Sequence, residues 1–294
     1  MSKKFVIKYD KKSDNQSSVP KYDRYFTENL VGFRTKNSFY FKNIINFIAN
    51  IVDQINIKLT REGIYLTSMD STHIALVDCF IPKTFFSAYN FTFKKNRDNE
   101  DYNSPTIIGI NVSVMQKILN YIKQDDELII YQTDNVDLLN ISIHNTKTDK
   151  FYSMKLMEIM SDELQIFELE DTSHIVLESK NFQKIISELS DIGENINIVL
   201  NDLDNTISFK CEGDMTKLNM IFSDDSDIVY ENLKPLNAKF SLKNMEVFSK
   251  GSNLNKNMFM DIGENLPVKL GYNFMDDGYI HYYLAPKIDD YYDD

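Results

Sequence analysis

Cysteine and histidine are scarce in this sequence of 294 residues, which contains only Cys79, Cys211 and four histidines. Two cysteines are too few for a disulfide framework or a thiolate-rich metal cluster, and so few histidines argue against a zinc site. No apolar run approaches the ~18 residues of a membrane-spanning helix, and the first four residues lack the apolar core of a signal peptide. These absences predict an intracellular protein in a reducing compartment, without membrane association.

Sequence patterns of catalysis are missing as well. There is no glycine-rich phosphate-binding loop and no Gly-x-Ser-x-Gly elbow. Asp70, Ser71 and His73 include the residue types of a hydrolytic triad, but they are nearly adjacent along the chain. Residues 224–227 lack the glycine of a calcium-binding loop. We predict no enzyme, no cofactor and no metal, and because acidic residues are abundant we keep a metal-dependent nuclease only as a remote alternative.

Acidic residues outnumber basic ones by 44 to 32, giving a formal net charge of −12. An acidic total argues against nucleic-acid binding by the surface as a whole, although a local basic stripe can exist within it. Residues 1–29 carry seven Lys or Arg against four Asp or Glu and predict a flexible basic extension, whereas residues 289–294 form an acidic tail. Residues 94–106 are polar and predict a surface insertion.

A pattern of strand, helix, strand, turn and strand recurs four times after residue 30. In the first copy, strand 31–35 precedes a helix whose apolar residues, from Ile44 to Ile55, are spaced by three and four; strands 56–59 and 64–69 follow. The other copies begin with strands 107–111, 175–177 and 238–240, and end with strands 138–143, 207–211 and 268–274. Ser or Asn near each helix start is expected to accept hydrogen bonds from first-turn amides: Asn37 or Ser38, Asn111 or Ser113, Ser179, and Ser241.

The four copies pair into two similar domains, 30–159 and 172–288, each with two strand-helix-strand-strand units. Alternating apolar and polar residues along the strands indicate antiparallel sheets with one buried face, so the fold class is α+β. Between the domains, residues 160–171 are acidic and contain isolated apolar side chains. Composition alone favours an ordinary linker with a few docking hydrophobic residues.

Four segments carry a resemblance to a known family. In chain order they are residues 66–76 (Leu66 to Leu76), 111–119, 152–157 and 282–288, the last containing Tyr283-Leu284-Ala285-Pro286. They resemble segments of the proliferating cell nuclear antigen family, the eukaryotic and archaeal sliding clamps of DNA replication. The resemblance implies the DNA-clamp fold and a homotrimeric ring without catalysis. Six domains would enclose duplex DNA, with helices lining the hole and sheets forming the outer wall.

The helices carry lysines that are the candidate DNA contacts. Without the resemblance, lysines on solvated helix faces need no special role. With it, phosphate contact is the better interpretation, because flexible ammonium groups meet phosphates without reading bases. The predicted DNA-binding residues are Lys42, Lys117, Lys123, Lys180, Lys184, Lys243 and Lys250.

The resemblance also implies an apolar groove for partner peptides that present a short helical turn with aliphatic and aromatic anchors. Such peptides belong to the polymerase, the clamp loader and other proteins with the family's interaction motif. Taken singly, each residue predicted to line this groove is of a type that more often packs in a protein core. The predicted groove residues are Met69, His73, Ile74, Leu164, Ile166, Pro267, Tyr283, Ala285 and Pro286.

Subunit contact is implied between edge strand 149–156 of one subunit and residues 215–223 of the next. Tyr121, Tyr152, Leu189 and Ile192 are predicted to pack beside this contact. The alternatives are a heteromeric checkpoint-type clamp and a monomeric processivity factor. The family places such a protein in the nucleus or at a site of viral DNA replication.

Overall fold

The computed structural model describes residues 31–91, 104–133, 137–160, 164, 166, 168–223, 228–275 and 277–287. The predictions for the extension 1–29 and the tail 289–294 fall outside these residues. So do the acidic residues 224–227 and most of the insertion 94–106.

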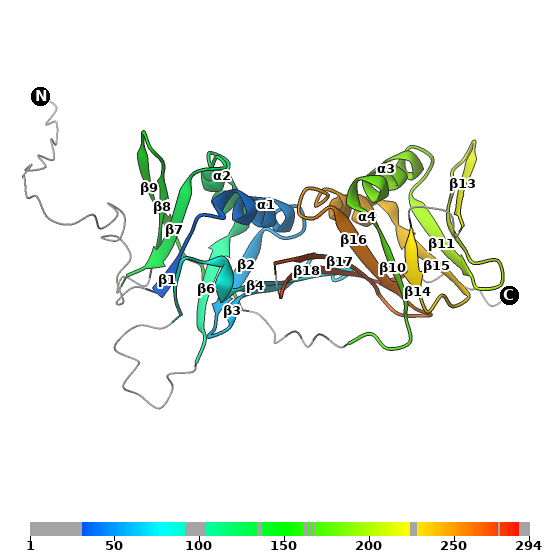
Figure 1. The fold of residues 1–294 in the computed structure, drawn as a ribbon, viewed down its shortest axis with the longest axis horizontal. Coiled ribbons are helices and arrows are strands. Elements are labelled where there is room, and N and C mark those ends of the chain that lie inside the picture. The colour runs from blue at the N-terminus through cyan, green and yellow to red at the C-terminus, as the bar shows by residue number, and fades with distance from the viewer. Residues whose placement is uncertain are drawn as a thin grey trace, which may run out of the picture.

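Four helices lie along one side of the molecule, two in each half, and the sheets lie along the other (Figure 1). Their bounds are α1 (Ser38–Ile48), α2 (Val112–Leu119), α3 (Ser179–Ser190) and α4 (Leu242–Ser249). The first helix is shorter than predicted, because the backbone N–H of Ile51 bonds to Ile48 in a tight i→i−3 turn. Ile55, predicted at the helix end, belongs to the following strand.

The strands form three antiparallel sheets. The five-stranded sheet has the order β5 (Ala88–Asn90), β1 (Val31–Thr35), β7 (Glu127–Gln132), β8 (Leu138–His144) and β9 (Asp149–Lys155). The four-stranded sheet has the order β13 (Lys217–Phe222), β12 (Thr206–Glu212), β11 (Asn195–Asn201) and β15 (Leu236–Ser241).

A nine-stranded sheet runs through both halves of the chain. Its order is β14 (Val229–Glu231), β10 (Ser173–Glu178), β16 (Asn257–Ile262), β17 (Val268–Phe274), β18 (Gly278–Leu284), β4 (Ala75–Pro82), β3 (Gly63–Met69), β2 (Gln54–Leu59) and β6 (Thr106–Asn111). The halves meet where β18 pairs with β4, from Tyr279 opposite Phe80 to Leu284 opposite Ala75. Backbone hydrogen bonds therefore place the C-terminal strand beside the loop that precedes β4.

The helix starts are held in two different ways. The Asn111 side chain caps α2 as predicted, accepting from the backbone N–H of Val114 at 2.9 Å. Ser38 and Ser179 are fully buried and make no cap; their hydroxyls donate to the carbonyls of Asp126 and Asn255. Ser241 makes no side-chain cap either. The capping prediction was therefore wrong for α1, α3 and α4, because two of these serines tie their helices to distant loops.

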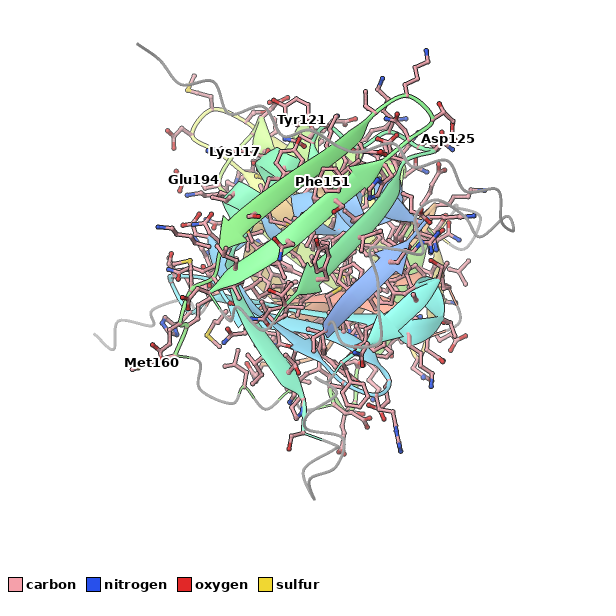
Figure 2. The ribbon with its side chains drawn as sticks, turned by 90° about the vertical axis from the view of Figure 1, so that its left-hand side faces the viewer. Lys117, Tyr121, Asp125, Phe151, Met160 and Glu194 are labelled. Carbon is pink, nitrogen blue, oxygen red and sulfur yellow. The ribbon has the colours of Figure 1, made fainter. Side chains whose placement is uncertain are left out.

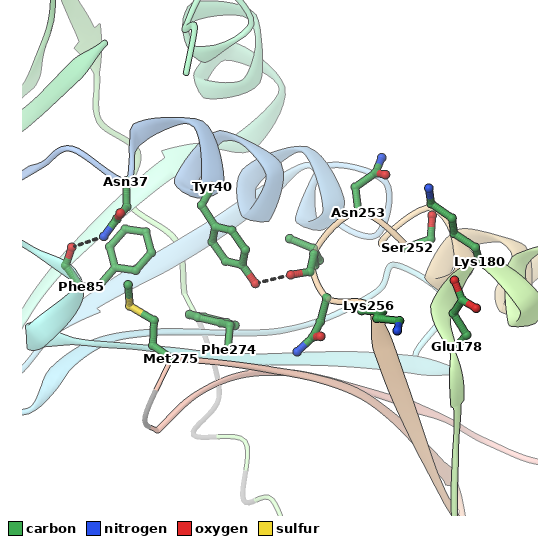
Figure 3. A pocket seen from close by; sticks show the side chains of 12 residues that line it. Asn37, Tyr40, Phe85, Glu178, Lys180, Ser252, Asn253, Lys256, Phe274 and Met275 are labelled. Carbon is green, nitrogen blue, oxygen red and sulfur yellow. Dashed lines mark hydrogen bonds between the residues drawn. The ribbon is translucent and has the colours of Figure 1, made fainter. Parts of the chain in front are cut away.

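Aromatic side chains lock the two halves together (Figure 3). The Tyr40 hydroxyl on α1 donates to the carbonyl of Leu254 at 2.6 Å, across the seam between the halves. The Tyr40 and Phe274 rings lie 5.2 Å apart, and the Phe47 ring on α1 lies 5.9 Å from the Phe248 ring on α4. This packing fixes the relative position of the surfaces described next.

Candidate functional site

The loop between β3 and β4 is organised by the carboxylate of Asp70. That carboxylate accepts from the backbone N–H groups of Ile74 at 2.9 Å and Ala75 at 2.8 Å, and from Thr72. His73 adopts φ 58°, in the left-handed region, and its N–H bonds back to the carbonyl of Asp70. Partial burial raises the pKa of Asp70, but the hydrogen bonds outweigh it and hold this pKa below its ordinary value.

This loop is built for shape rather than for catalysis. The Asp70 carboxylate accepts hydrogen bonds from Thr72 and from the backbone of its own turn, and the exposed His73 is held in a strained backbone conformation. The turn leaves Ile74 about 45% exposed at the surface. The sequence cluster that superficially suggested a triad is therefore a rigid turn that presents an apolar side chain.

An apolar cavity of about 590 Å³ opens beside this turn. Three distant segments build it, because β18 pairs with β4 and the backbone N–H of Ala285 bonds to the carbonyl of Ile74 at 3.0 Å. A fourth wall comes from the connector between the domains. The predicted residues that line this cavity are Met69, His73, Ile74, Ile166, Pro267, Tyr283 and Ala285.

Two predicted groove residues do not line this cavity. Leu164 lines an adjoining cavity of about 620 Å³ instead, and Pro286 is half-buried just beyond Ala285. Six lining residues were missed: Ala75, Leu76, Glu168, Leu169, Glu170 and Leu266. Leu76 is the last residue of segment 66–76 and Leu266 precedes Pro267, so both could have been predicted from the residues beside them. Nothing in the sequence distinguished Leu169 from Leu164.

The predicted DNA-contact lysines lie on or next to the helices, and most are exposed. Exposed ammonium groups on one side of the molecule are suited to sequence-independent phosphate contact. The exposed lysines on helices α2, α3 and α4 or at their ends are Lys117, Lys180, Lys184, Lys243 and Lys250.

Lys42 and Lys123 are placed differently from the other five lysines. The Lys42 ammonium donates to the carbonyls of Asn120 at 3.2 Å and Ile122 at 3.3 Å, and it lies 5.2 Å from the centre of the Phe39 ring. Lys42 thus joins α1 to the residues just after α2. Lys123 is exposed but lies in the loop beyond α2, because the chain leaves the helix at Leu119.

The predicted contact strands lie at opposite ends of the long axis (Figure 1). Strand β9 is one edge of the five-stranded sheet, and β13 is one edge of the four-stranded sheet. Figure 2 looks onto the end that carries β9, with Phe151 on the sheet and Tyr121 above it. Each strand has a large exposed apolar residue that the prediction included in its range without singling it out: Phe151 is 57% exposed and Ile221 is 61% exposed.

The side chains predicted to flank this contact divide into two groups. Tyr121 is exposed, and the Lys150 ammonium lies 5.5 Å from its ring centre. Tyr152 and Ile192 are half-buried against the core. Leu189 is fully buried, so the prediction that it packs against a neighbouring subunit was wrong. It sits on the apolar stripe of α3, and that stripe faces its own sheet.

Within the described residues, no group of three or more His, Cys, Asp or Glu side chains is arranged to hold a metal ion. No helix in the same part of the chain is long and apolar enough to cross a membrane.

Paired helices over antiparallel sheets, repeated in two halves that share one sheet, define the architecture of a DNA sliding clamp subunit. The models for the N-terminal and C-terminal domains of proliferating cell nuclear antigen match residues 30–165 and 165–287. The chain belongs to the proliferating cell nuclear antigen family. It is a DNA sliding clamp, a non-enzymatic scaffold of a family that binds DNA and partner proteins and forms trimers.

Individual relatives agree over nearly their whole length. The chain is 27% identical to proliferating cell nuclear antigen of Chaetomium thermophilum over 266 residues, covering 87% of this chain and 98% of the relative. It is 27% identical to proliferating cell nuclear antigen 2 of Plasmodium falciparum over 268 residues, covering 86% and 97%. The crystal structure of the Entamoeba histolytica protein has the same fold, with a TM-score of 0.78 at 24% identity, covering 88% of this chain and 99% of that one.

Proposed function

We propose that the apolar cavity beside the 70–75 turn is the docking groove for partner proteins of this clamp. The observation that supports it is convergence: seven of the nine predicted groove residues, from segments far apart in the sequence, line one apolar cavity. Exposed aliphatic side chains such as Ile74 and Ile166 form walls against which a short helical turn can bury its anchors. Met69 adds an adaptable surface. The partners are the polymerase, the clamp loader and other proteins with the family's interaction motif.

Duplex DNA is the proposed occupant of the space beside the helices. The five exposed helix lysines would contact phosphates as point charges, and Lys123 would contact them from its loop. Such contacts are weak and sensitive to salt, and topological enclosure by the ring would retain the clamp on DNA. Lys42 would contribute mainly by fixing the position of α1 against the end of α2.

Subunit contact is proposed between β9 of one subunit and β13 of the next, giving a homotrimer of six domains. Two open edges at opposite ends of one chain form a head-to-tail contact, and a ring that closes leaves neither edge exposed. The proposed domains are 30–159 and 172–288, joined by connector 160–171. The proposed location is the nucleus or a site of viral DNA replication, which a fluorescent fusion imaged beside labelled replication foci would test.

The groove is tested with a fluorescent peptide that carries the family's interaction motif. Fluorescence anisotropy would measure its dissociation constant with the full chain and with Ile74→Asp and Ile166→Ala. Ile74→Asp is expected to weaken binding about 10-fold or more, and Ile166→Ala by less, since aliphatic truncation in a groove removes less contact area. Leu203→Asp, an exposed residue in a distant turn, is the matched control. Equal affinity for all four proteins would contradict the groove.

A further inference from the structure

A row of aromatic rings crosses the nine-stranded sheet next to the groove. Neighbouring centroids lie between 4.1 and 5.9 Å apart, and the rings come from strands β3, β4, β18, β16 and β10. Gly271 makes the row continuous, because it lies between His281 and Phe259, and a Cβ there would clash with the Phe259 ring. In order, the rings are Tyr65, Phe80, Tyr279, His281, Phe259 and His174.

Part of this row forms the floor of the adjoining cavity of about 620 Å³. The connector borders this cavity too, through Leu164, Ile166, Glu168 and Leu169. The adjoining cavity is continuous with the apolar groove, since both are lined by Ile166, Glu168, Leu169 and Tyr283. A peptide anchored in the groove therefore has this second cavity as a neighbour.

The second cavity has an excess of negative charge. Its described lining contains the carboxylates of Asp78, Asp261 and Glu168 against the single ammonium of Lys269. Burial, and secondarily Lys269, lowers the pKa of His281 to about 3, so this imidazole is neutral at physiological pH. The cavity thus combines flat aromatic rings with carboxylates, which is the environment that a guanidinium group prefers.

Lys269 illustrates how a cation fits this surface. Its ammonium lies 5.4 Å from the centre of the Phe259 ring and 3.6 Å from Asp261. Asp78 lies at the other end of the cavity, where it accepts from the Thr67 hydroxyl at 2.7 Å and from the Tyr279 hydroxyl. These bonds fix the orientation of the Asp78 carboxylate, whose two oxygens have capacity for further donors.

We propose that this cavity is a subsite of the docking groove that binds an arginine side chain flanking the anchor residues of a partner peptide. The guanidinium would stack on the rings of Tyr65 and Tyr279 and donate to Asp78. The proposal rests on the proposed groove, which it extends from apolar anchors to a charged one.

The test compares motif peptides that carry arginine on one flank, arginine on the other flank, or alanine on both. One arginine flank is expected to tighten binding about 5- to 10-fold over alanine. Asp78→Asn, which keeps the shape of the side chain, should abolish most of that gain, whereas Asp202→Asn, a distant exposed residue with the same charge change, should retain it.

Several results would overturn the subsite. One is the absence of any gain from arginine on either flank. Another is a gain that survives Asp78→Asn unchanged, which would assign it to general electrostatic attraction. Citrulline in place of arginine tests the charge without altering the protein and should lose the gain; retention would also contradict the proposal. If the alanine-flanked peptide itself does not bind, the proposed groove is contradicted, and so is the subsite that rests on it.

Discussion

Single side chains shape the groove, and Asp70 shows this most clearly. In the turn between β3 and β4, its carboxylate takes the place of strand-to-strand hydrogen bonding by accepting from the N–H groups of Ile74 and Ala75. A carboxylate that accepts several N–H bonds is held in its charged form, in agreement with the lowered pKa of Asp70. The exposed position of Ile74 therefore depends on an acidic residue that does not itself line the cavity.

Asp70→Ala is expected to lower the free energy of unfolding by about 1–2 kcal/mol, because backbone N–H groups lose a charged acceptor. Peptide affinity should fall as well, since the turn that positions Ile74 loosens. Chemical denaturation and anisotropy measure the two effects, with Asp202→Ala as the control. Because the pKa of Asp70 is lowered by folding, its stabilisation is present above the ordinary carboxyl pKa and disappears as pH falls through the folded value. An unchanged stability at neutral pH would contradict this role.

His281 gives a second prediction about the pH dependence of stability, with the same sign. Its folded pKa of about 3 lies below the ordinary value of 6.5, so only the unfolded chain takes up this proton in mild acid. The free energy of unfolding should therefore fall as pH drops from about 6.5 toward 3. Denaturation at pH 7 and pH 5 should show a smaller loss for His281→Gln than for the unaltered chain. Equal losses would mean that His281 is not held neutral.

The residue types of the groove could be predicted, but not every contact. Met69, His73 and Ile74 lie in a segment whose sequence is distinctive, and pairing of β18 with β4 brings them to Tyr283 and Ala285 as expected. The sequence could not show that Leu189 is a buried core residue rather than a subunit-contact residue. An apolar side chain on a helix gives the same sequence pattern whether it faces the core or a neighbouring subunit.

At the scale of the elements, the helices are positioned partly by the residues predicted to touch DNA. Lys42 uses its ammonium on carbonyl groups just past α2, whereas Lys117 projects from α2 into solvent. Sequence alone could place both lysines near helices, but the partner of Lys42 is about eighty residues away in the chain and only the fold brings it close.

Lys42→Met is expected to cost about 0.5–1.5 kcal/mol of stability, because two carbonyl groups lose a charged donor. Lys117→Met should change stability by less than about 0.5 kcal/mol. In DNA binding the order reverses: Lys117→Met should weaken affinity and reduce the salt slope by about one for each subunit whose Lys117 contacts a phosphate. Thermal unfolding and salt-dependent binding measure the pair. Equal effects of the two variants on both properties would contradict the assignment.

The edge strands β9 and β13 are the proposed subunit contact of the ring. Phe151→Asp and Ile221→Asp each place a charge on an exposed apolar residue of an edge strand, where pairing with a neighbour would bury it. Each is expected to shift the chain from trimer to monomer at micromolar concentration. Leu203→Asp, at a still more exposed aliphatic residue in the turn between β11 and β12, should leave assembly unchanged. Sedimentation velocity reports the distribution, and a trimer unaffected by both edge variants would exclude these strands.

At the scale of the whole molecule, one sheet and one aromatic seam hold two similar halves as a rigid arc (Figure 1). The fourfold repeat predicted both halves, since strand and helix periodicities are local properties of the sequence. The repeat did not predict that β18 and β4 would merge the halves into nine strands, because strand partners are decided by long-range packing. That junction places the groove and the proposed arginine subsite at the joint between the domains.

Ring formation is the property on which enclosure of DNA depends. Light scattering coupled to size exclusion would measure the solution mass of the full chain at micromolar concentration. Three chains of 34.4 kDa give about 103 kDa (3 × 34.4), and this is the mass expected for the closed trimer. A stable species of 34.4 kDa under these conditions would contradict the ring.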